Sequence, residues 1–247
     1  MMVPLLCLDL ALASQGTVRD SVGLTVSTDR TTYQVGEPVR LTVLAINNGD
    51  TPVRGFFINR PYHDTVEIRY RRVDRPFSRF ATALKHSEEI KVLRAPMILN
   101  PGHEAKSEFV LSFDATARRF VLDEPGDYEF QVSYRAEPAD PTTLLVSNVA
   151  SVGVSTPPNK QGGAFRQYST AEIGLLAQYD PLSSSDVDPT VVQSVAELID
   201  KYPSSPYAEA ARKGLLGALR QKLLRNQATE AERAVYDRLQ QMRPQDR

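Results

Sequence analysis

The stretch from Tyr128 to Arg135, YEFQVSYR, decides the fold of the first half of the chain. Its large apolar residues occupy every second position, and polar residues fill the positions between them. Successive side chains of an extended chain point to opposite faces, so this alternation predicts a strand with one buried face and one face in water. Antiparallel sheets are built from strands of this kind. The turn sequence Glu124-Pro125-Gly126-Asp127 marks its start.

The same two-residue period recurs between about residues 22 and 154. Turn sequences rich in glycine, proline and asparagine separate the periodic segments, as at 35–38, 47–50 and 100–102. Seven or eight short strands at this spacing are typical of an all-β sandwich. The predicted strands are residues 22–28, 38–47, 53–59, 65–72, 89–96, 104–113, 127–134 and 144–154.

Several motifs of this region occur together in one known group of domains. The chain has Thr32-Tyr33-Gln34-Val35-Gly36-Glu37-Pro38-Val39, a strand that ends in Ala45-Ile46-Asn47-Asn48-Gly49, and the turns Asn100-Pro101-Gly102 and Pro125-Gly126-Asp127. These motifs resemble the bacterial immunoglobulin-like domains, including those of the intracellular proteinase inhibitor type. The spacing of Glu124, Gly126 and Tyr128 fits a tyrosine corner, in which the phenol hydroxyl bonds back to the backbone. The resemblance implies an immunoglobulin-like fold over residues 22–154 and specifies no activity.

A helical period replaces the strand period in the last third of the chain. Residues 156–168 have no period and contain prolines, glycines and polar residues, which predicts a linker. Beyond the linker, apolar residues recur at intervals of three and four, as they do along one face of a helix. Four helix starts are predicted at Ser169 with Glu172, at Asp188-Pro189, at Ser205-Pro206 and at Thr229 with Glu232.

The junction between the second and third predicted helices has a distinctive sequence, Tyr202-Pro203-Ser204-Ser205-Pro206-Tyr207. One proline ends a helix, the other lies in the first turn of the next, and the alanines that follow let the two helices approach closely. The junction resembles the turn of tetratricopeptide repeats, and the resemblance spans about residues 189–243, roughly one and a half repeats. Because so few repeats rarely bury enough surface, we expect these helices to pack on the β region, to dimerise or to dock on a partner.

These patterns predict an immunoglobulin-like, all-β sandwich followed by a C-terminal all-α domain of helical hairpins. The predicted divisions are a signal segment or its remnant at residues 1–16, the sandwich at 17–155, the linker at 156–168 and a tetratricopeptide-like helical domain at 169–247.

The composition excludes several classes of protein. The 247 residues carry 29 Lys and Arg and 30 Asp and Glu, a net charge of -1 that provides no global attraction for nucleic acid. The single cysteine, Cys7, excludes an intrachain disulfide and a cysteine-rich zinc site. An apolar run at residues 3–13 has the length of a signal peptide and is too short to span a bilayer. We therefore expect an extracytoplasmic protein. Asp9 within the run argues against a signal, and the alternative is a short hydrophobic strand or a frayed terminus.

The chain contains none of the common catalytic motifs: no G-x-S-x-G, H-E-x-x-H, Walker A or G-x-G-x-x-G sequence. Its three histidines, His63, His86 and His103, each lie near a turn or strand end, where a solvated imidazole is the usual state. A joint site would require all three to converge. The sequence therefore predicts no enzyme, no cofactor and no metal site.

Two groups of aromatic and basic residues are candidates for binding a partner. Consecutive Phe56 and Phe57 cannot both face one core on a strand, so one of them, with nearby Tyr62, is expected at an interface with the helices or at a partner site. Arginines at alternate positions of strand 65–72 are expected on its wet face, where they form a solvated surface, dock a partner or contact a nucleic acid. The candidate partner-binding residues are Phe56, Phe57, Tyr62, Arg69, Arg71, Phe77 and Phe80.

The predicted function is that of a non-catalytic extracytoplasmic module for protein–protein interaction or scaffolding. Its partner is expected to be another protein, with homo-oligomerisation as a further option, and with no nucleic acid and no membrane span. One alternative is a protease inhibitor whose loops at 60–65 or 74–88 enter a cleft, as the resemblance to proteinase inhibitors implies. The other alternative is an accessory domain of an envelope enzyme.

Overall fold

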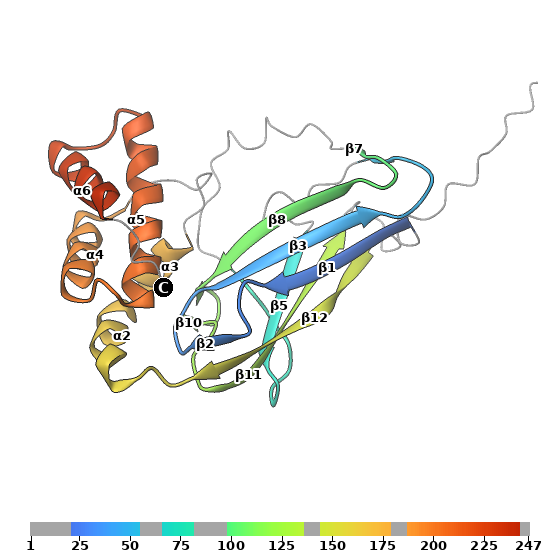
Figure 1. The fold of residues 1–247 in the computed structure, drawn as a ribbon, viewed down its shortest axis with the longest axis horizontal. Helices are drawn as coiled ribbons and strands as arrows, with labels where there is room; N and C mark the ends of the chain where they lie inside the picture. Colours follow the sequence, from blue (N-terminus) through green and yellow to red (C-terminus); the bar gives the residue numbers. More distant parts are fainter. Residues whose placement is uncertain (1–20, 55–65, 82–97, 136–143, 179–186, 243–247) are drawn as a thin grey trace, which may run out of the picture.

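The computed structural model describes residues 21–54, 66–81, 98–135, 144–178 and 187–242 (Figure 1). A β region forms one end of the molecule, and a group of helices forms the other. The strands are β1 (Val22–Thr28), β2 (Thr32–Gln34), β3 (Val39–Asn47), β4 (Val53–Arg54), β5 (Val66–Arg72), β6 (Ser78–Arg79), β7 (Ile98–Leu99), β8 (Glu104–Leu111), β9 (Phe113–Asp114), β10 (Arg119–Phe120), β11 (Gly126–Arg135) and β12 (Leu144–Ser155). The helices are η3 (Asn159–Gln161), α2 (Gly162–Tyr168), α3 (Ala171–Ala177), α4 (Pro189–Lys201), α5 (Pro206–Leu224) and α6 (Glu230–Gln241).

A three-stranded antiparallel sheet has β3 at its centre, between β1 and β8. Residues of β3 alternate between buried and half-buried along its whole length. Val43 lies opposite Val26 on one side and opposite Ser107 on the other. The predicted strands at 22–28, 38–47 and 104–113 are confirmed here, although the last is divided into β8 and β9.

A five-stranded sheet has the order β2-β12-β11-β5-β6. Its centre is β11, the strand of the YEFQVSYR stretch, whose four large apolar side chains are all buried. The neighbours β12 and β5 pair with β11 in antiparallel fashion, whereas β2 pairs in parallel with the end of β12. The register between β11 and β12 shifts between Gln131 and Ser133, so β12 contains a bulge.

The two sheets enclose one apolar core, and the loop before β11 is fixed to it by a phenol. The buried Tyr128 hydroxyl lies 2.9 Å from Asp123 Oδ1 and 3.1 Å from the carbonyl oxygen of Glu124, and it accepts a hydrogen bond from the Glu124 N–H at 3.2 Å. The bond of the predicted tyrosine corner, from the phenol back to the backbone, is confirmed.

Asn148 joins the two sheets along the side where β1 and β12 run next to each other. Its Oδ1 accepts from the Val26 N–H at 2.8 Å, and its Nδ2 donates to the Val26 carbonyl at 3.0 Å. One side-chain amide therefore satisfies both backbone groups of an edge residue of β1, much as a neighbouring strand would.

The helices begin at capping residues that satisfy their free N–H groups. Asp188, Ser205 and Thr229 each accept a backbone hydrogen bond at the start of α4, α5 and α6, and the capping box of Thr229 with Glu232 is complete. These three predicted starts are confirmed. The predicted cap at Ser169 is wrong, because the next residue, Thr170, accepts from Ile173 N at the start of α3.

Five aromatic side chains in successive contact, here called the aromatic junction, connect the β region with the helices. Phe113 and Phe120, from the β9–β10 hairpin, belong to the same buried cluster as the helices. The ring contacts continue through Tyr168, Tyr207 and Phe165 at centroid distances of 5.3 to 5.5 Å. The Tyr207 hydroxyl donates to the Val35 carbonyl at 2.7 Å, and the Tyr168 and Ser112 hydroxyls lie 2.8 Å apart.

The predicted fold class, an all-β sandwich followed by a separate all-α domain, is wrong. The structure has mixed α/β content, about 35% helix and 37% strand, and the sheets combine parallel and antiparallel pairs. Alternation along a strand specifies which side chains are buried but not the direction of the neighbouring strand, so the parallel pair of β2 with β12 was not predictable from it. The β9–β10 hairpin contributes its phenylalanines to the helical core instead of to the core between the sheets.

The range predicted as a linker contains ordered structure. Residues 159–168 form η3 and α2, and Ala164 and Tyr168 are buried. Phe165 of α2 packs against both apolar clusters and lies against Gly36, where φ is +81° and an added Cβ would overlap the ring. Gln178, at the end of α3, donates from Nε2 to the Phe113 carbonyl at 2.6 Å and so connects α3 with the β region.

Candidate functional site

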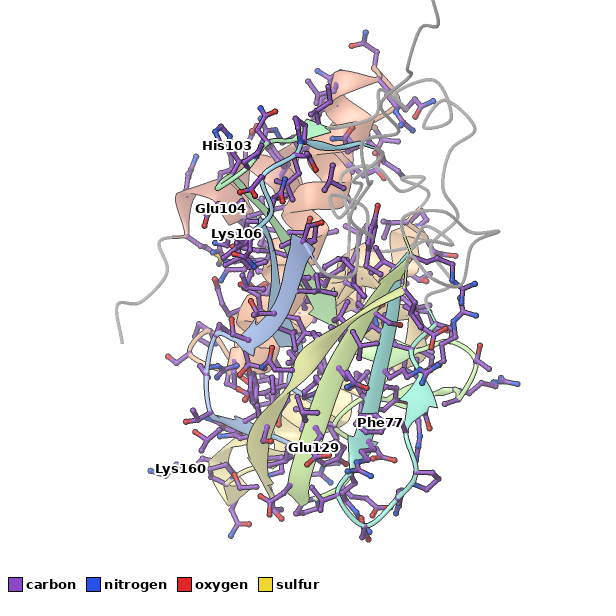
Figure 2. The ribbon with its side chains drawn as sticks, turned by 90° about the vertical axis from the view of Figure 1, so that its right-hand side faces the viewer. Phe77, His103, Glu104, Lys106, Glu129 and Lys160 are labelled. Atoms are coloured by element: carbon purple, nitrogen blue, oxygen red, sulfur yellow. The ribbon has the colours of Figure 1, made fainter. Side chains whose placement is uncertain are left out.

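The side of the five-stranded sheet that faces away from its core, here called the outer face, carries apolar and charged side chains in rows across the strands. One row runs from Val149 through Gln131 and Arg69 to Arg79. The parallel rows are Val146, Ser133 and Glu67, and Ser151, Glu129 and Arg71. Figure 2 shows Glu129 on this face and Phe77 beside it.

The bulge in β12 places two valines on the outer face. Residues three apart in a regular strand point to opposite faces, so without the bulge Val146 and Val149 would lie on opposite faces of the sheet. Between Gln131 and Ser133 of β11 the chain advances by two residues, whereas β12 advances by three, and both valines therefore point outward. Val146 is 53% exposed and Val149 is 42% exposed. The two valines therefore form a small exposed apolar area on the outer face.

The arginines of the outer face are held in place by neighbouring carboxylates. Arg69 donates to Glu67, and Arg79 Nε lies 3.8 Å from the same carboxylate. Arg71 donates to Glu129 Oε2 at 2.7 Å, and its guanidinium carbon lies 4.4 Å from the centroid of the Phe77 ring. The stacked, ion-paired guanidinium presents an ordered flat surface to an incoming molecule.

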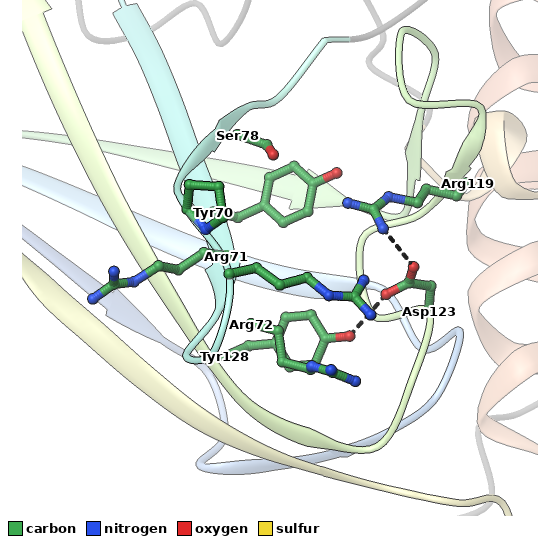
Figure 3. A pocket seen from close by; sticks show the side chains of 9 residues that line it. Tyr70, Arg71, Arg72, Ser78, Arg119, Asp123 and Tyr128 are labelled. Carbon is green, nitrogen blue, oxygen red and sulfur yellow. Dashed lines mark hydrogen bonds and ion pairs between the residues drawn. The ribbon is translucent and has the colours of Figure 1, made fainter.

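A cleft of about 180 Å³ opens at the end of β5, next to the outer face (Figure 3). Arg72 and Arg119 extend toward Asp123 and Tyr128 in this cleft, whereas Arg71 points away from them. Arg119 Nη1 donates to Asp123 Oδ2 at 2.8 Å. The residues lining the cleft are Tyr70, Arg71, Arg72, Arg75, Pro76, Ser78, Arg119, Asp123 and Tyr128.

Glu124 occupies the position between two arginines at the rim of this cleft. Its Oε2 accepts from Arg72 Nη1 and from Arg75 Nη2, the latter at 2.8 Å. Arg72 also forms a two-point ion pair with Asp74, from Nε and Nη2 to the two carboxylate oxygens. The Arg72 guanidinium therefore donates to two carboxylates at once.

The ion pairs and burial around the cleft shift several pKa values. Hydrogen bonding to Arg72 lowers the pKa of Asp74, and the same bond raises the pKa of Arg72. Burial, together with the bond to Asp123, raises the pKa of Tyr128 to about 12. Burial and the neighbouring Asp114, whose Oδ2 accepts from the Tyr70 hydroxyl at 2.9 Å, also raise the pKa of Tyr70. Both phenols are therefore neutral donors at neutral pH.

The structure brings some of the predicted site residues together and separates others. Arg69, Arg71 and Phe77 lie on the outer face or beside it. Phe80 is only 7% exposed and packs edge-on against Tyr70, so it belongs to the core and offers almost no surface to a partner. Phe56, Phe57 and Tyr62 lie outside the described residues, as do the loop at 60–65 and residues 82–88 of the loop at 74–88.

Sequence reasoning missed Arg119, Asp123 and the two outward valines. Arg119 and Asp123 are four residues apart near the turn before β11, a spacing that could have indicated an ion pair but not its place beside β5. The valines were not recognised as a pair, because in VSNV they lie three positions apart, a spacing that places two side chains on opposite faces of a regular strand.

Of the three histidines, one lies within the described ranges. His103 is exposed in the turn before β8, and His63 and His86 lie outside those ranges. Where the structure describes the chain, no group of three His, Cys, Asp or Glu side chains is placed to hold a metal ion. In the same ranges, no helix combines the length and the apolar character needed to cross a bilayer.

Comparisons with known proteins assign the chain to no family. No family model matches it, and no curated protein matches it. Among solved structures, a β-glucosidase from Erythrobacter marinus is 15% identical at a TM-score of 0.33, over 55% of this chain and 15% of the enzyme. An alkylpurine DNA glycosylase from Pseudomonas fluorescens is 14% identical at a TM-score of 0.34, over 55% of this chain and 31% of that one.

A third similar structure is much shorter. The CARDB domain of a Pyrococcus furiosus protein is 13% identical at a TM-score of 0.30, over 56% of this chain and 96% of the domain. The chain therefore matches less than a third of the length of the first two proteins and nearly all of the third. Similarities of this size assign no activity to the chain.

Proposed function

We propose that this chain is a non-catalytic protein–protein interaction module that binds its partner with the outer face of the five-stranded sheet. The single observation that supports the proposal most directly is the pair of exposed valines, Val146 and Val149, which the bulge in β12 turns to the same side as the arginines. Protein interfaces combine an apolar centre with arginine and aromatic side chains around it. The outer face offers this combination in Val149, Arg69, Arg71 and Phe77.

Order within the free surface also supports binding. Arg69 pairs with Glu67 and Arg71 pairs with Glu129, so both arginine side chains are already restricted before a partner binds. They therefore have less rotamer freedom to lose on binding. Immobilising such a side chain at an interface costs about 0.5–1.5 kcal/mol, so arginines that are already fixed reduce that loss. The proposed partner is another protein, and the proposed location is outside the cytoplasm.

The proposal is tested by affinity capture from the cell-envelope fraction with the full chain as bait. Val149→Asp places an unpaired charge in the apolar part of the outer face, and we expect it to lose at least one protein that the unmodified chain retains. The captured proteins are identified and quantified by mass spectrometry, and the interaction is then measured with the purified pair.

The matched control is Leu224→Asp, because Leu224 is the most exposed large apolar residue described, at 68%, and lies on α5 instead of on the sheet. This variant should retain every partner. If both variants lose the same proteins, or if neither loses any, the outer face is not the binding surface. The proposed location is checked separately by sequencing the N-terminus of the mature protein, where an intact Met1 would contradict export by a cleaved signal.

A further inference from the structure

We propose that the arginine cleft beside β5 is a binding site for a carboxylate of the partner, and that Glu124 is the internal occupant that such a carboxylate displaces. The juxtaposition that leads to this proposal is one carboxylate oxygen, Glu124 Oε2, held between Arg72 and Arg75 at the rim of a cleft with room for a further group. The source of the ligand rests on the proposed function, since the cleft adjoins the outer face through Arg71.

The arginines of the cleft differ in how firmly their partners hold them. Arg72 is 22% exposed and is fixed by two-point pairing with Asp74 as well as by Glu124. Arg75 is 35% exposed, and its Nη2 donates to the same Oε2 of Glu124. Two guanidiniums directed at one oxygen form a cradle in which a carboxylate is recognised by charge and by N–H donors together.

Glu124 is the member of this arrangement that can leave without disturbing the fold. Its side chain is 45% exposed, and its structural contacts with Tyr128 use only its backbone N–H and carbonyl. Asp123, by contrast, is 22% exposed and binds both Arg119 and Tyr128. A ligand carboxylate that enters the cradle therefore replaces a solvated side chain and leaves the tyrosine corner intact.

Glu124 neutralises one of the positive charges of the cleft. Arg72, Arg75 and Arg119 are balanced by Asp74, Asp123 and Glu124, and the fourth arginine of the lining, Arg71, is balanced by Glu129, so the cleft is neutral while Glu124 is in place. Displacing or removing the Glu124 side chain leaves one uncompensated positive charge in a partly enclosed space, where charges interact more strongly than in open water. Because the cradle already accommodates a carboxylate, the ligand that fits it is a carboxylate.

The proposal is tested by titrating the purified full chain with a short capped polyglutamate peptide at low ionic strength. Binding is followed by NMR through the Nε–Hε resonances of Arg72 and Arg75, with a capped polyglutamine peptide as the uncharged probe. We expect weak binding by the unmodified chain. Glu124→Ala should strengthen it by about fivefold, the effect of removing one competing surface carboxylate, and added salt should weaken it. Glu124→Gln, which retains the shape of the side chain without its charge, should strengthen it in the same direction.

Glu108 provides a closely matched control. It is 46% exposed and bridges two cations, Arg40 and Lys106, on β3 and β8, away from the cleft. Glu108→Ala removes the same charge from a similar cradle and should leave polyglutamate binding unchanged. Adding Arg75→Gln to the Glu124→Ala chain should abolish the gain.

Three results would overturn the proposal. They are an equal gain for the Glu108 and Glu124 variants, binding that survives Arg75→Gln, and equal binding of the uncharged peptide. The proposed function is judged independently by the Val149→Asp capture. Polyglutamate bound in the cleft with an unaltered capture would support the site and contradict the outer face, and the opposite pair of results would do the reverse.

Discussion

Asn148 makes the hydrogen bonds that a neighbouring strand would otherwise make to the edge of β1. Its amide bonds both backbone groups of Val26, at 2.8 and 3.0 Å, across 122 residues of sequence. Asn148→Ala removes both bonds, and we expect the free energy of unfolding to fall by about 1–2 kcal/mol because the Val26 backbone groups lose their partners. Urea unfolding followed by circular dichroism measures the change.

The control for this prediction lies on the same strand. Ser151 is exposed on the outer face, three residues beyond Asn148, so Ser151→Ala should change the unfolding midpoint little. A destabilisation of Asn148→Ala no larger than that of Ser151→Ala would show that the contact with β1 contributes nothing to stability.

Helix α6 depends on a carboxylate that links it to α5. Glu232 completes the capping box with Thr229 and accepts from Lys222 Nζ at 2.6 Å, and both side chains of this ion pair are largely buried. Burial by itself would raise the pKa of Glu232, but the bonds from Lys222 and Thr229 outweigh it and lower the pKa. A lowered pKa in the folded state adds stability that is fully present above the ordinary value of 4.5 and is lost as the pH falls through the folded value.

We therefore expect α6 to lose stability in acid. Glu232→Gln should lower its stability by about 2 kcal/mol near neutral pH and remove most of the acid dependence. Hydrogen exchange of the α6 amides, measured at a series of pH values, tests both effects. Glu230→Gln, in the same first turn but exposed, is the control and should retain the acid dependence. Acid exchange unchanged by Glu232→Gln would contradict the role of this carboxylate.

Elements with a local signal could be predicted from the sequence, and elements set by distant neighbours could not. The starts of α4, α5 and α6 follow from a capping residue and the turn after it, so a few residues contain all the information. Strand β2 has three residues, and its parallel pairing depends on β12, more than 100 positions away, which no local pattern encodes. The same holds for the candidate site. Alternation predicts that Arg69 and Arg71 lie on the solvent-facing side of the sheet, whereas the bulge of β12 and the pairing of Arg72 with Glu124 depend on residues distant in sequence and could not be predicted.

At the scale of the whole molecule, buried phenols couple stability to alkaline pH. Among the residues that the structure describes, burial is the largest cause that raises the pKa of five tyrosines, and the pKa of Tyr128 rises to about 12. The five are Tyr33, Tyr70, Tyr128, Tyr168 and Tyr207. A raised phenol pKa contributes stability that is fully present below the ordinary value of 10.0 and is lost as the pH rises through the folded value.

We expect a spectrophotometric titration of tyrosinate to show a late phase, in which these five buried phenols ionise only together with the loss of the folded circular dichroism signal. If all phenols ionised in one step near pH 10 without unfolding, the burial of these five side chains would be contradicted.

We expect the aromatic junction to make the β region and helix α5 unfold as one cooperative unit. Tyr207→Phe removes the 2.7 Å bond to the Val35 carbonyl, and we expect a loss of about 1–2 kcal/mol that appears equally in both parts. Hydrogen exchange in β3 and in α5 at increasing urea measures the two parts separately. Tyr236→Phe, which removes a hydrogen bond inside α6 alone, is the control and should change neither. Separate unfolding of the two parts would contradict the prediction.

The same junction determines how the protein could hold two molecules at once. The ring contacts and the hydroxyl bonds of Tyr168 and Tyr207 hold the β region against the helices, so we expect a molecule on the sheet and another on the helices to keep one separation and one orientation. The gain in affinity for a ligand that binds both sites then depends on whether the distance between its two binding groups equals this constant separation. Among the described residues, no flexible linker between the two sites adjusts to a mismatch. A protein built in this way would select ligands by the distance between their two binding groups.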